Sequence, residues 1–195
     1  MATLVLAFGP TGRALAVPIY YSENGHYYER VDCPAMTGCT WAVAKASAEA
    51  RSYGGVQGYL ATITSAAEEN FIVGNLGPYA SLIHHWIGGY QSPGSVEPGG
   101  GWTWVTGETW NWTAWKPDGN PDNRWGSHGV FGGSPSGSDE EALCFWDDPS
   151  LVPLWNDADE FAELKGYVVE YVPEPVTLSL LAAGLGGLLL RRRRK

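Results

Sequence analysis

The sequence predicts an α+β domain, with two helices followed by an antiparallel sheet that one long loop interrupts. Both helical segments lie in the first half of the chain, and no helical period is found from His85 onward. Short segments rich in aromatic and β-branched residues follow instead, as is typical of strands. About 35 residues between Thr106 and Glu140 are rich in Gly, Pro, Asn and Trp. A loop of that length is usually functional or disordered, and its tryptophans argue against disorder. A bound ion would hold it in place.

The two helices are predicted from their start signals. Thr40 is expected to cap a helix from Trp41 to about Tyr53, which Gly54-Gly55 would end. The second helix is expected to open at Ser65-Ala66-Ala67-Glu68, a capping box in which serine binds the amide of Glu68 and Glu68 reaches back. This helix is predicted to run to about Val73.

The strands are predicted from runs of aromatic, β-branched and alternating residues. We expect them at His26 to Val31, Tyr59 to Ile63, Trp86 to Tyr90, Gly101 to Val105, Leu143 to Trp146 and Gly166 to Tyr171.

Residues 17–172 form one strongly acidic domain. They contain six Lys and Arg against twenty Asp and Glu, a net charge of −14, whereas the whole chain carries −9 because its C-terminus is basic. This charge repels nucleic acid, so nucleic-acid binding is excluded as a function class. Carboxylates concentrated in one region favour a cation instead.

The three cysteines divide into a pair and a single residue. Cys33 and Cys39 are six positions apart around a Pro-Ala-Met-Thr-Gly turn, and they could close a small disulfide loop outside the cytoplasm. Cys144 lies in a strand-like run, and we interpret it as a packed, inert thiol.

Both ends of the chain are interpreted as targeting segments. Residues 1–16 are predicted to be a signal-peptide remnant, and a disordered leader is the alternative. Residues 173–195 comprise Pro173-Glu174-Pro175, an uncharged apolar run over 176–190 and a basic end over 191–195. The apolar run is shorter than the roughly 20 residues that span a bilayer comfortably, although an ordinary membrane anchor is the alternative.

The tail resembles a PEP-CTERM sorting signal, on the evidence of Pro173, Glu174, Pro175 and the four arginines 191–194. The resemblance implies a Gram-negative bacterium, recognition by exosortase and the export machinery, and cleavage near the Pro-Glu-Pro motif. It also implies transient membrane contact through residues 176–195. The product would reach the cell envelope, the cell surface or an exopolysaccharide-rich extracellular matrix.

Acid and amide side chains gather on both sides of one proline and again after one tryptophan. The members of the set are Asn120, Asp122, Glu140, Asn156 and Asp157. Hard cations such as Ca²⁺ take six to eight oxygen ligands, which these side chains and backbone carbonyls provide. With a tryptophan and a glycine-rich loop between the two groups, the pattern indicates a calcium site that reads a polyhydroxylated ligand, most simply a sugar.

The stretch from about His26 to Tyr171 resembles a C-type lectin-like domain. The segments that carry the resemblance occur in the family's order, and they are Gly58 to Ile63, Trp86 to Gly88, Trp155 to Asp157 and Gly166 to Tyr171. The resemblance implies two helices, antiparallel sheets and a long calcium-binding loop.

It also implies that one Ca²⁺ is held by Asn120, Asp122, Glu140, Asn156 and Asp157, with places left for two neighbouring sugar hydroxyls. The Asn120–Pro121 bond is expected to be cis, because only X–Pro bonds adopt that form at low cost.

The order of amide, proline and acid at residues 120–122 resembles the galactose-type members. A tryptophan and a His-Gly loop follow, as in those members, so the expected sugar-binding residues are Asn120, Asp122, Trp125, His128, Glu140 and Asn156. The chain departs from the pattern in having Asn120 instead of glutamine, in the later place of Trp125 and in lacking the family's usual disulfides.

The favoured function is therefore a secreted, non-enzymatic, calcium-dependent lectin that binds a glycan or exopolysaccharide. The alternative is a protein or matrix interaction module on the same fold, with Trp155-Asn156-Asp157 purely structural. A glycosidase using Asp147-Asp148 and Asp159-Glu160 is not favoured, because spacing alone is poor evidence for paired catalytic carboxylates. A second calcium near Glu141 and Asn123 is a further hypothesis, with Gln91 where an acid would help.

Overall fold

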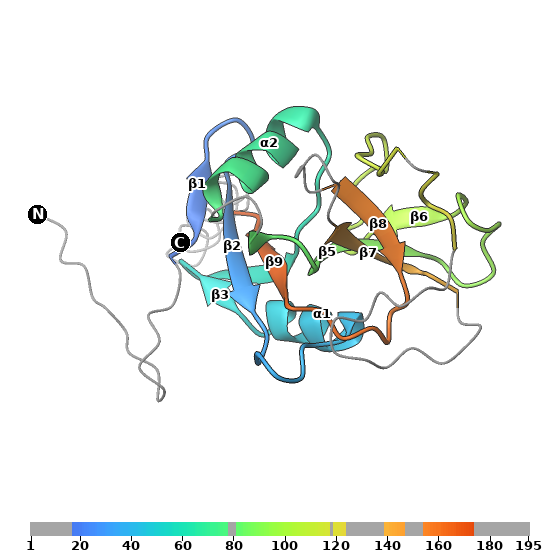
Figure 1. Ribbon diagram of the computed structural model, residues 1–195. Helices are drawn as coiled ribbons and strands as arrows, with labels where there is room; N and C mark the ends of the chain where they lie inside the picture. Colours follow the sequence, from blue (N-terminus) through green and yellow to red (C-terminus); the bar gives the residue numbers. More distant parts are fainter. Residues whose placement is uncertain (1–16, 78–80, 118, 124–138, 147–153, 174–195) are drawn as a thin grey trace, which may run out of the picture.

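The computed structural model describes residues 17–77, 81–117, 119–123, 139–146 and 154–173, and it has the predicted α+β architecture (Figure 1). Within these residues the helices are α1 (Trp41–Glu49) and α2 (Ala66–Asn75). The strands are β1 (Ile19–Tyr21), β2 (His26–Asp32), β3 (Ser52–Tyr53), β4 (Val56–Leu60), β5 (His85–Gln91), β6 (Trp102–Trp104), β7 (Ala142–Trp146), β8 (Leu154–Ala158) and β9 (Gly166–Tyr171). Strands β1, β3 and β8 were not among the sequence predictions.

The sheet is organised around the C-terminal strand β9. The hydrogen-bonded order is β1-β2-β9-β5-β7-β8, with β4 also on β9, β6 on β5 and β3 on β4. One edge of β9 pairs with β2 along its length, while β5 and β4 share the other edge. The β5–β9 pair is parallel and departs from the expected antiparallel arrangement, since β9 is inserted between β2 and β5, which run in opposite directions.

Helix α1 begins where predicted and ends earlier. The hydroxyl of Thr40 accepts a hydrogen bond from the amide of Val43, as expected of an N-cap. The helix ends at Glu49 and not near Tyr53, because Tyr53 belongs to β3. Gly54 and Gly55, at φ +59° and +85°, form the two-residue turn between β3 and β4. Two successive positive φ values are what a tight hairpin requires, so the glycine pair closes a hairpin and not a helix.

Helix α2 begins at the predicted cap. The hydroxyl of Ser65 accepts from the amide of Glu68, while the Glu68 carboxylate accepts from the amide and hydroxyl of Thr64. The helix continues to Asn75, two residues beyond the predicted end.

The core has two parts, which lie on opposite faces of the sheet because alternate residues of a strand point to opposite sides. One contains Tyr28, Ile72, Ile87, Trp104 and Trp155, and the rings of the loop residues Trp110, Trp112 and Trp115 pack against it. The other contains the Cys33–Cys39 disulfide and the buried free thiol of Cys144. Burial raises the pKa of the Cys144 thiol well above its ordinary value, which agrees with an inert role. The packing of the loop residues Trp110, Trp112 and Trp115 on the first part of the core attaches the beginning of the long loop to the domain.

No helix among the described residues is long and apolar enough to cross a membrane. The predicted leader and the tail from Glu174 onward lie outside these residues, and Pro173 is the last residue described.

Candidate functional site

Three carboxylates converge where the loop segment 119–123 meets β7 and β8. One oxygen from each of Asp122, Glu140 and Asp157 lies within 4.8 Å of the others. Glu140 and Asp157 are only 3% and 1% exposed. Buried carboxylates at this spacing repel one another unless a cation or protons compensate their charge.

The carboxylate of Asp157 is only half satisfied by the protein. Its Oδ2 accepts from the amides of Asp122, at 2.7 Å, and Asn123, at 2.8 Å. Its Oδ1 is buried and has no hydrogen-bond partner in the described part of the chain. Burial raises the pKa of Asp157 and outweighs the two amide donors, which lower it. A buried carboxylate with one orphaned oxygen, close to two further carboxylates, fits a hard cation such as Ca²⁺.

The two amide side chains of the predicted set are hydrogen-bonded to each other. Asn120 Nδ2 donates to Asn156 Oδ1 at 2.7 Å, and Asn156 Nδ2 donates to the backbone carbonyl of Asp157. The Asn120–Pro121 bond is cis. All five predicted ligands thus belong to one group built from β8, the residues just before β7 and the segment 119–123.

Asn123 organises this group, a role that was not predicted from the sequence. Its backbone amide binds Asp157, and its Oδ1 accepts from the amide of Glu140 at 2.7 Å. Its φ of +47° lies in the left-handed region, which asparagine tolerates better than most residues. An asparagine after Asn-Pro-Asp is a signal for such a bend, although it does not reveal which partners the side chain finds.

A second acidic group lies beside the first. Glu97, Asp139 and Glu141 bring carboxylate oxygens within 4.8 Å, and Asn123 Nδ2 donates to Asp139 at 3.3 Å. Gln91, which stands where an acid would help to hold a second calcium, donates to the carbonyls of Pro98 and Gly100. The described members of this group are mostly exposed.

Several predicted site residues lie outside the described part of the chain. They are Trp125, His128, Glu174 and Pro175, together with Asp147 and Asp148.

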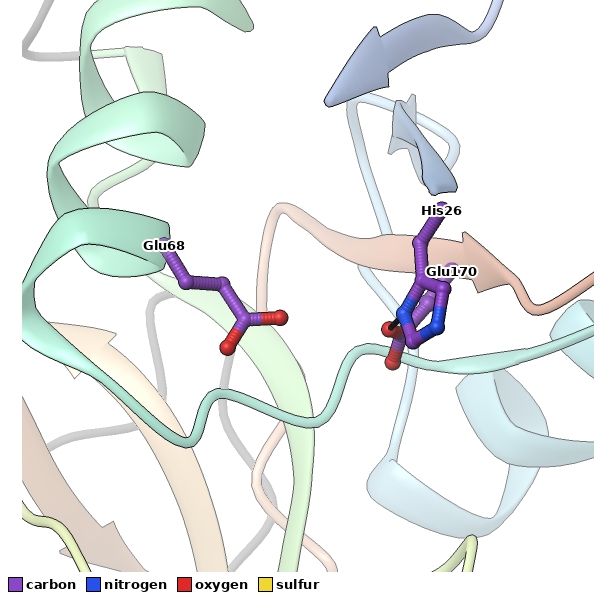
Figure 2. Close-up of side chains that lie close together, drawn as sticks. All are labelled: His26, Glu68 and Glu170. Atoms are coloured by element: carbon purple, nitrogen blue, oxygen red, sulfur yellow. Dashed lines mark hydrogen bonds and ion pairs between the residues drawn. The ribbon is translucent and has the colours of Figure 1, made fainter. Parts of the chain in front are cut away.

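A buried polar cluster on the other side of the domain links β2, α2 and β9, and its ionisable members are His26, Glu68 and Glu170 (Figure 2). His26 Nδ1 lies 2.5 Å from Glu170 Oε1. The hydroxyl of Tyr28 lies 2.5 Å from Glu68 and 3.0 Å from Glu170. The amide of Thr62 donates to the second oxygen of Glu170 at 2.8 Å. Every carboxylate oxygen here has a partner, so the cluster is a closed hydrogen-bond network that sequence spacing could not reveal.

This cluster should make stability depend on pH. Burial opposes the charged imidazole of His26, but the hydrogen bond and charge of Glu170 outweigh it and raise its pKa above 6.5. Burial also raises the pKa of Glu170, so the His26–Glu170 pair keeps a proton to a higher pH than the separate groups would. A raised histidine pKa contributes stability that is complete below pH 6.5 and is lost as the pH rises through the folded-state value.

In urea unfolding, the free energy of unfolding of the parent should therefore fall above pH 6.5, by at most about 1 kcal/mol after solvent screening. His26→Gln should not show this fall. Identical pH profiles for the two proteins would contradict a proton-dependent pair.

Comparison with known proteins identifies the fold of the domain. No protein-family model matches the chain. It is 36% identical over 152 residues to Halomucin of Haloquadratum walsbyi (strain DSM 16790 / HBSQ001), which covers 76% of this chain. The chain spans about 1% of the length of that relative.

Solved structures share the fold over most of their length. The cow C-type carbohydrate-recognition domain of CD23 matches with a TM-score of 0.56 and 20% identity, over 81% of this chain and 95% of that one. The chain has the C-type lectin fold. The Ca²⁺-independent C-type lectin SPL-2 from Saxidomus purpuratus matches with a TM-score of 0.57 and 18% identity, over 81% and 93% of the two chains. At these identities the C-type lectin fold is shared, whereas ligand and ion have to be argued from the residues.

Proposed function

We propose that this domain is a calcium-dependent carbohydrate-binding protein. The observation that carries the proposal is the convergence of Asp122, Glu140 and Asp157, with a buried Asp157 oxygen that lacks a protein partner. Three carboxylates with two amides form the hard oxygen donor set that Ca²⁺ prefers. The residues present fit the ion.

The five ligands would hold the ion and also contact the sugar. The carboxylates of Asp122, Glu140 and Asp157 would hold the ion, and Asn120 and Asn156 would turn their amide oxygens toward it. Bound calcium would offer two coordination places to neighbouring sugar hydroxyls. A carboxylate can accept each hydroxyl proton and an amide NH₂ can donate to the hydroxyl oxygen, so interleaved acids and amides read a pair of hydroxyls.

The order Asn120-Pro121-Asp122 supports a galactose-type preference. It places the amide before the proline and the acid after it, which is the order of the galactose-type members that the sequence resembles. Trp125 and His128 are proposed to complete the sugar contacts, with the indole packing on the apolar face of the ring.

Export is proposed from the two ends of the sequence. Pro173, Glu174 and Pro175 would be recognised by exosortase after residues 176–195 had entered the membrane, and the domain would be released to the envelope, the surface or the matrix. The negative domain would remain soluble in such a setting and would attract divalent cations.

The direct test is retention on immobilised galactose. The full chain, kept soluble in a detergent without a sugar headgroup, should be retained in millimolar Ca²⁺ and released by a chelator. Immobilised mannose should retain it less. Passage of the folded protein through both columns in calcium would overturn the carbohydrate proposal, while equal retention on both would overturn only the galactose preference.

A second candidate function is an interaction module that needs no calcium. The mutual hydrogen bond between Asn120 and Asn156 favours it, because these amides satisfy each other without an ion. The C-type lectin fold also occurs in SPL-2, which is described as Ca²⁺-independent. Retention on a glycan or protein ligand that survives the chelator would support this candidate.

A further inference from the structure

Trp155 connects the two halves of the candidate site. Its amide donates to the carbonyl of Ala114 and its carbonyl accepts from the amide of Lys116, so β8 is tied to the chain that leads to Asn120. Trp155 also pairs with Phe145 of β7. Its ring is fully buried and meets edge to face the rings of Trp104, Trp112 and Trp115. Any shift of Trp155 would move the adjoining ligands Asn156 and Asp157 relative to the loop.

A carboxyl group from α2 holds the indole of Trp155. Glu69 Oε2 accepts from Trp155 Nε1 at 3.2 Å, across 86 positions of sequence. Glu69 is 8% exposed, and its Oε1 is buried without a hydrogen-bond partner among the described residues. The preceding residue, Glu68, points into the His26 cluster (Figure 2), so α2 is fastened to the domain at two different places.

We propose that Glu69 is a positioning residue of the candidate calcium site. In its uncharged form it fixes the indole of Trp155, and through β8 it sets where Asn156 and Asp157 stand. This inference rests on the proposed function, because it concerns the same five ligands.

The uncharged form follows from the surroundings of Glu69. An ionised carboxylate with one unpaired oxygen among packed indoles is strongly disfavoured. Burial raises the pKa of Glu69 to about 8; the indole N–H opposes this shift, and the neighbouring carboxylate of Glu68 adds to it. Because the folded-state pKa lies above the ordinary 4.5, this group makes the fold lose stability as the pH rises from about 4.5 to about 8. Above about 8 the carboxylate is ionised with one buried oxygen unpaired, and a movement of Glu69 toward water would relieve that charge and disturb its contact with Trp155.

The test measures calcium affinity by calorimetry on the full chain, with calcium alone as the ligand, at pH 7.5 and pH 9.5. The affinity of the parent should fall by about three- to tenfold over this interval. Glu69→Gln, which keeps the acceptor and cannot ionise, should bind as the parent does at pH 7.5 and show no alkaline loss. Glu69→Ala should bind about tenfold more weakly at both pH values. Glu49→Gln, at a partly exposed position of α1, is the matched control and should keep the profile of the parent.

A second readout needs no calcium. The near-ultraviolet circular dichroism of the tryptophans should titrate near pH 8 in the parent and not in Glu69→Gln. A parent that binds calcium with the same alkaline profile as Glu69→Gln would overturn the inference even if Glu69→Ala failed to fold. A tryptophan titration specific to Glu69 in a protein that binds no calcium would support the Glu69–Trp155 contact and reject the calcium proposal instead.

Discussion

Asp157→Asn should abolish calcium-dependent sugar binding and leave the calcium-free domain at least as stable as the parent. Asparagine can still accept from the amides of Asp122 and Asn123 through its oxygen. Its NH₂ would replace the orphaned oxygen in a group that also contains the carboxylates of Asp122 and Glu140. Removing a buried, half-satisfied charge should raise the free energy of unfolding without calcium by about 1 kcal/mol.

The loss of a carboxylate ligand should lower calcium affinity on the order of 100-fold or more. The measurement is the midpoint of thermal unfolding with and without calcium, together with retention on immobilised galactose. The parent should unfold at a higher temperature in calcium, since a ligand that binds only the folded state stabilises it. Asp157→Asn should show no such shift.

Asp159→Asn provides a matched control on the same segment. Asp159 is also buried, and its oxygen accepts from the amide of Phe161, a bond that asparagine can keep. Asp159 is not one of the three converging carboxylates, so this variant should retain the calcium shift. A calcium shift that survived Asp157→Asn and disappeared in Asp159→Asn would show that the ion is held elsewhere.

Glu170→Ala should be the most destabilising single change in the buried cluster. Glu170 is fully buried and contacts His26, Tyr28 and the amide of Thr62. Its removal leaves an imidazole without its carboxylate and a buried amide without an acceptor. The loss of one partner of a buried pair typically lowers the free energy of unfolding by about 3–5 kcal/mol.

Equilibrium denaturation at pH 6 measures this effect. Glu170→Gln should be milder, because its amide oxygen can still accept from Thr62. Glu49→Ala, which removes a partly exposed pair with Lys45, should change the free energy of unfolding by no more than about 0.5 kcal/mol. If Glu170→Ala were as mild as Glu49→Ala, the cluster would contribute little to the fold.

Local sequence signals predicted the features that depend on neighbouring residues. Thr40 and Ser65 cap their helices because a side-chain oxygen finds an amide three residues later. The same kind of signal failed at Gly54-Gly55, since a glycine pair suits a helix end and a hairpin alike. Only the pairing of β3 with β4 decides between them.

The amino-acid sequence by itself determined the fold class and the chemical character of the candidate site, because caps, strand patterns and hard oxygen donors are properties of short segments. The tertiary structure alone decided what each acid meets. The partners of Glu170, Glu69 and Asp157 lie up to 144, 86 and 35 positions away in the chain. Burial and pairing over such separations arise only when β9, α2 and β8 pack together, and they determine whether a carboxylate holds a proton, an indole or a cation.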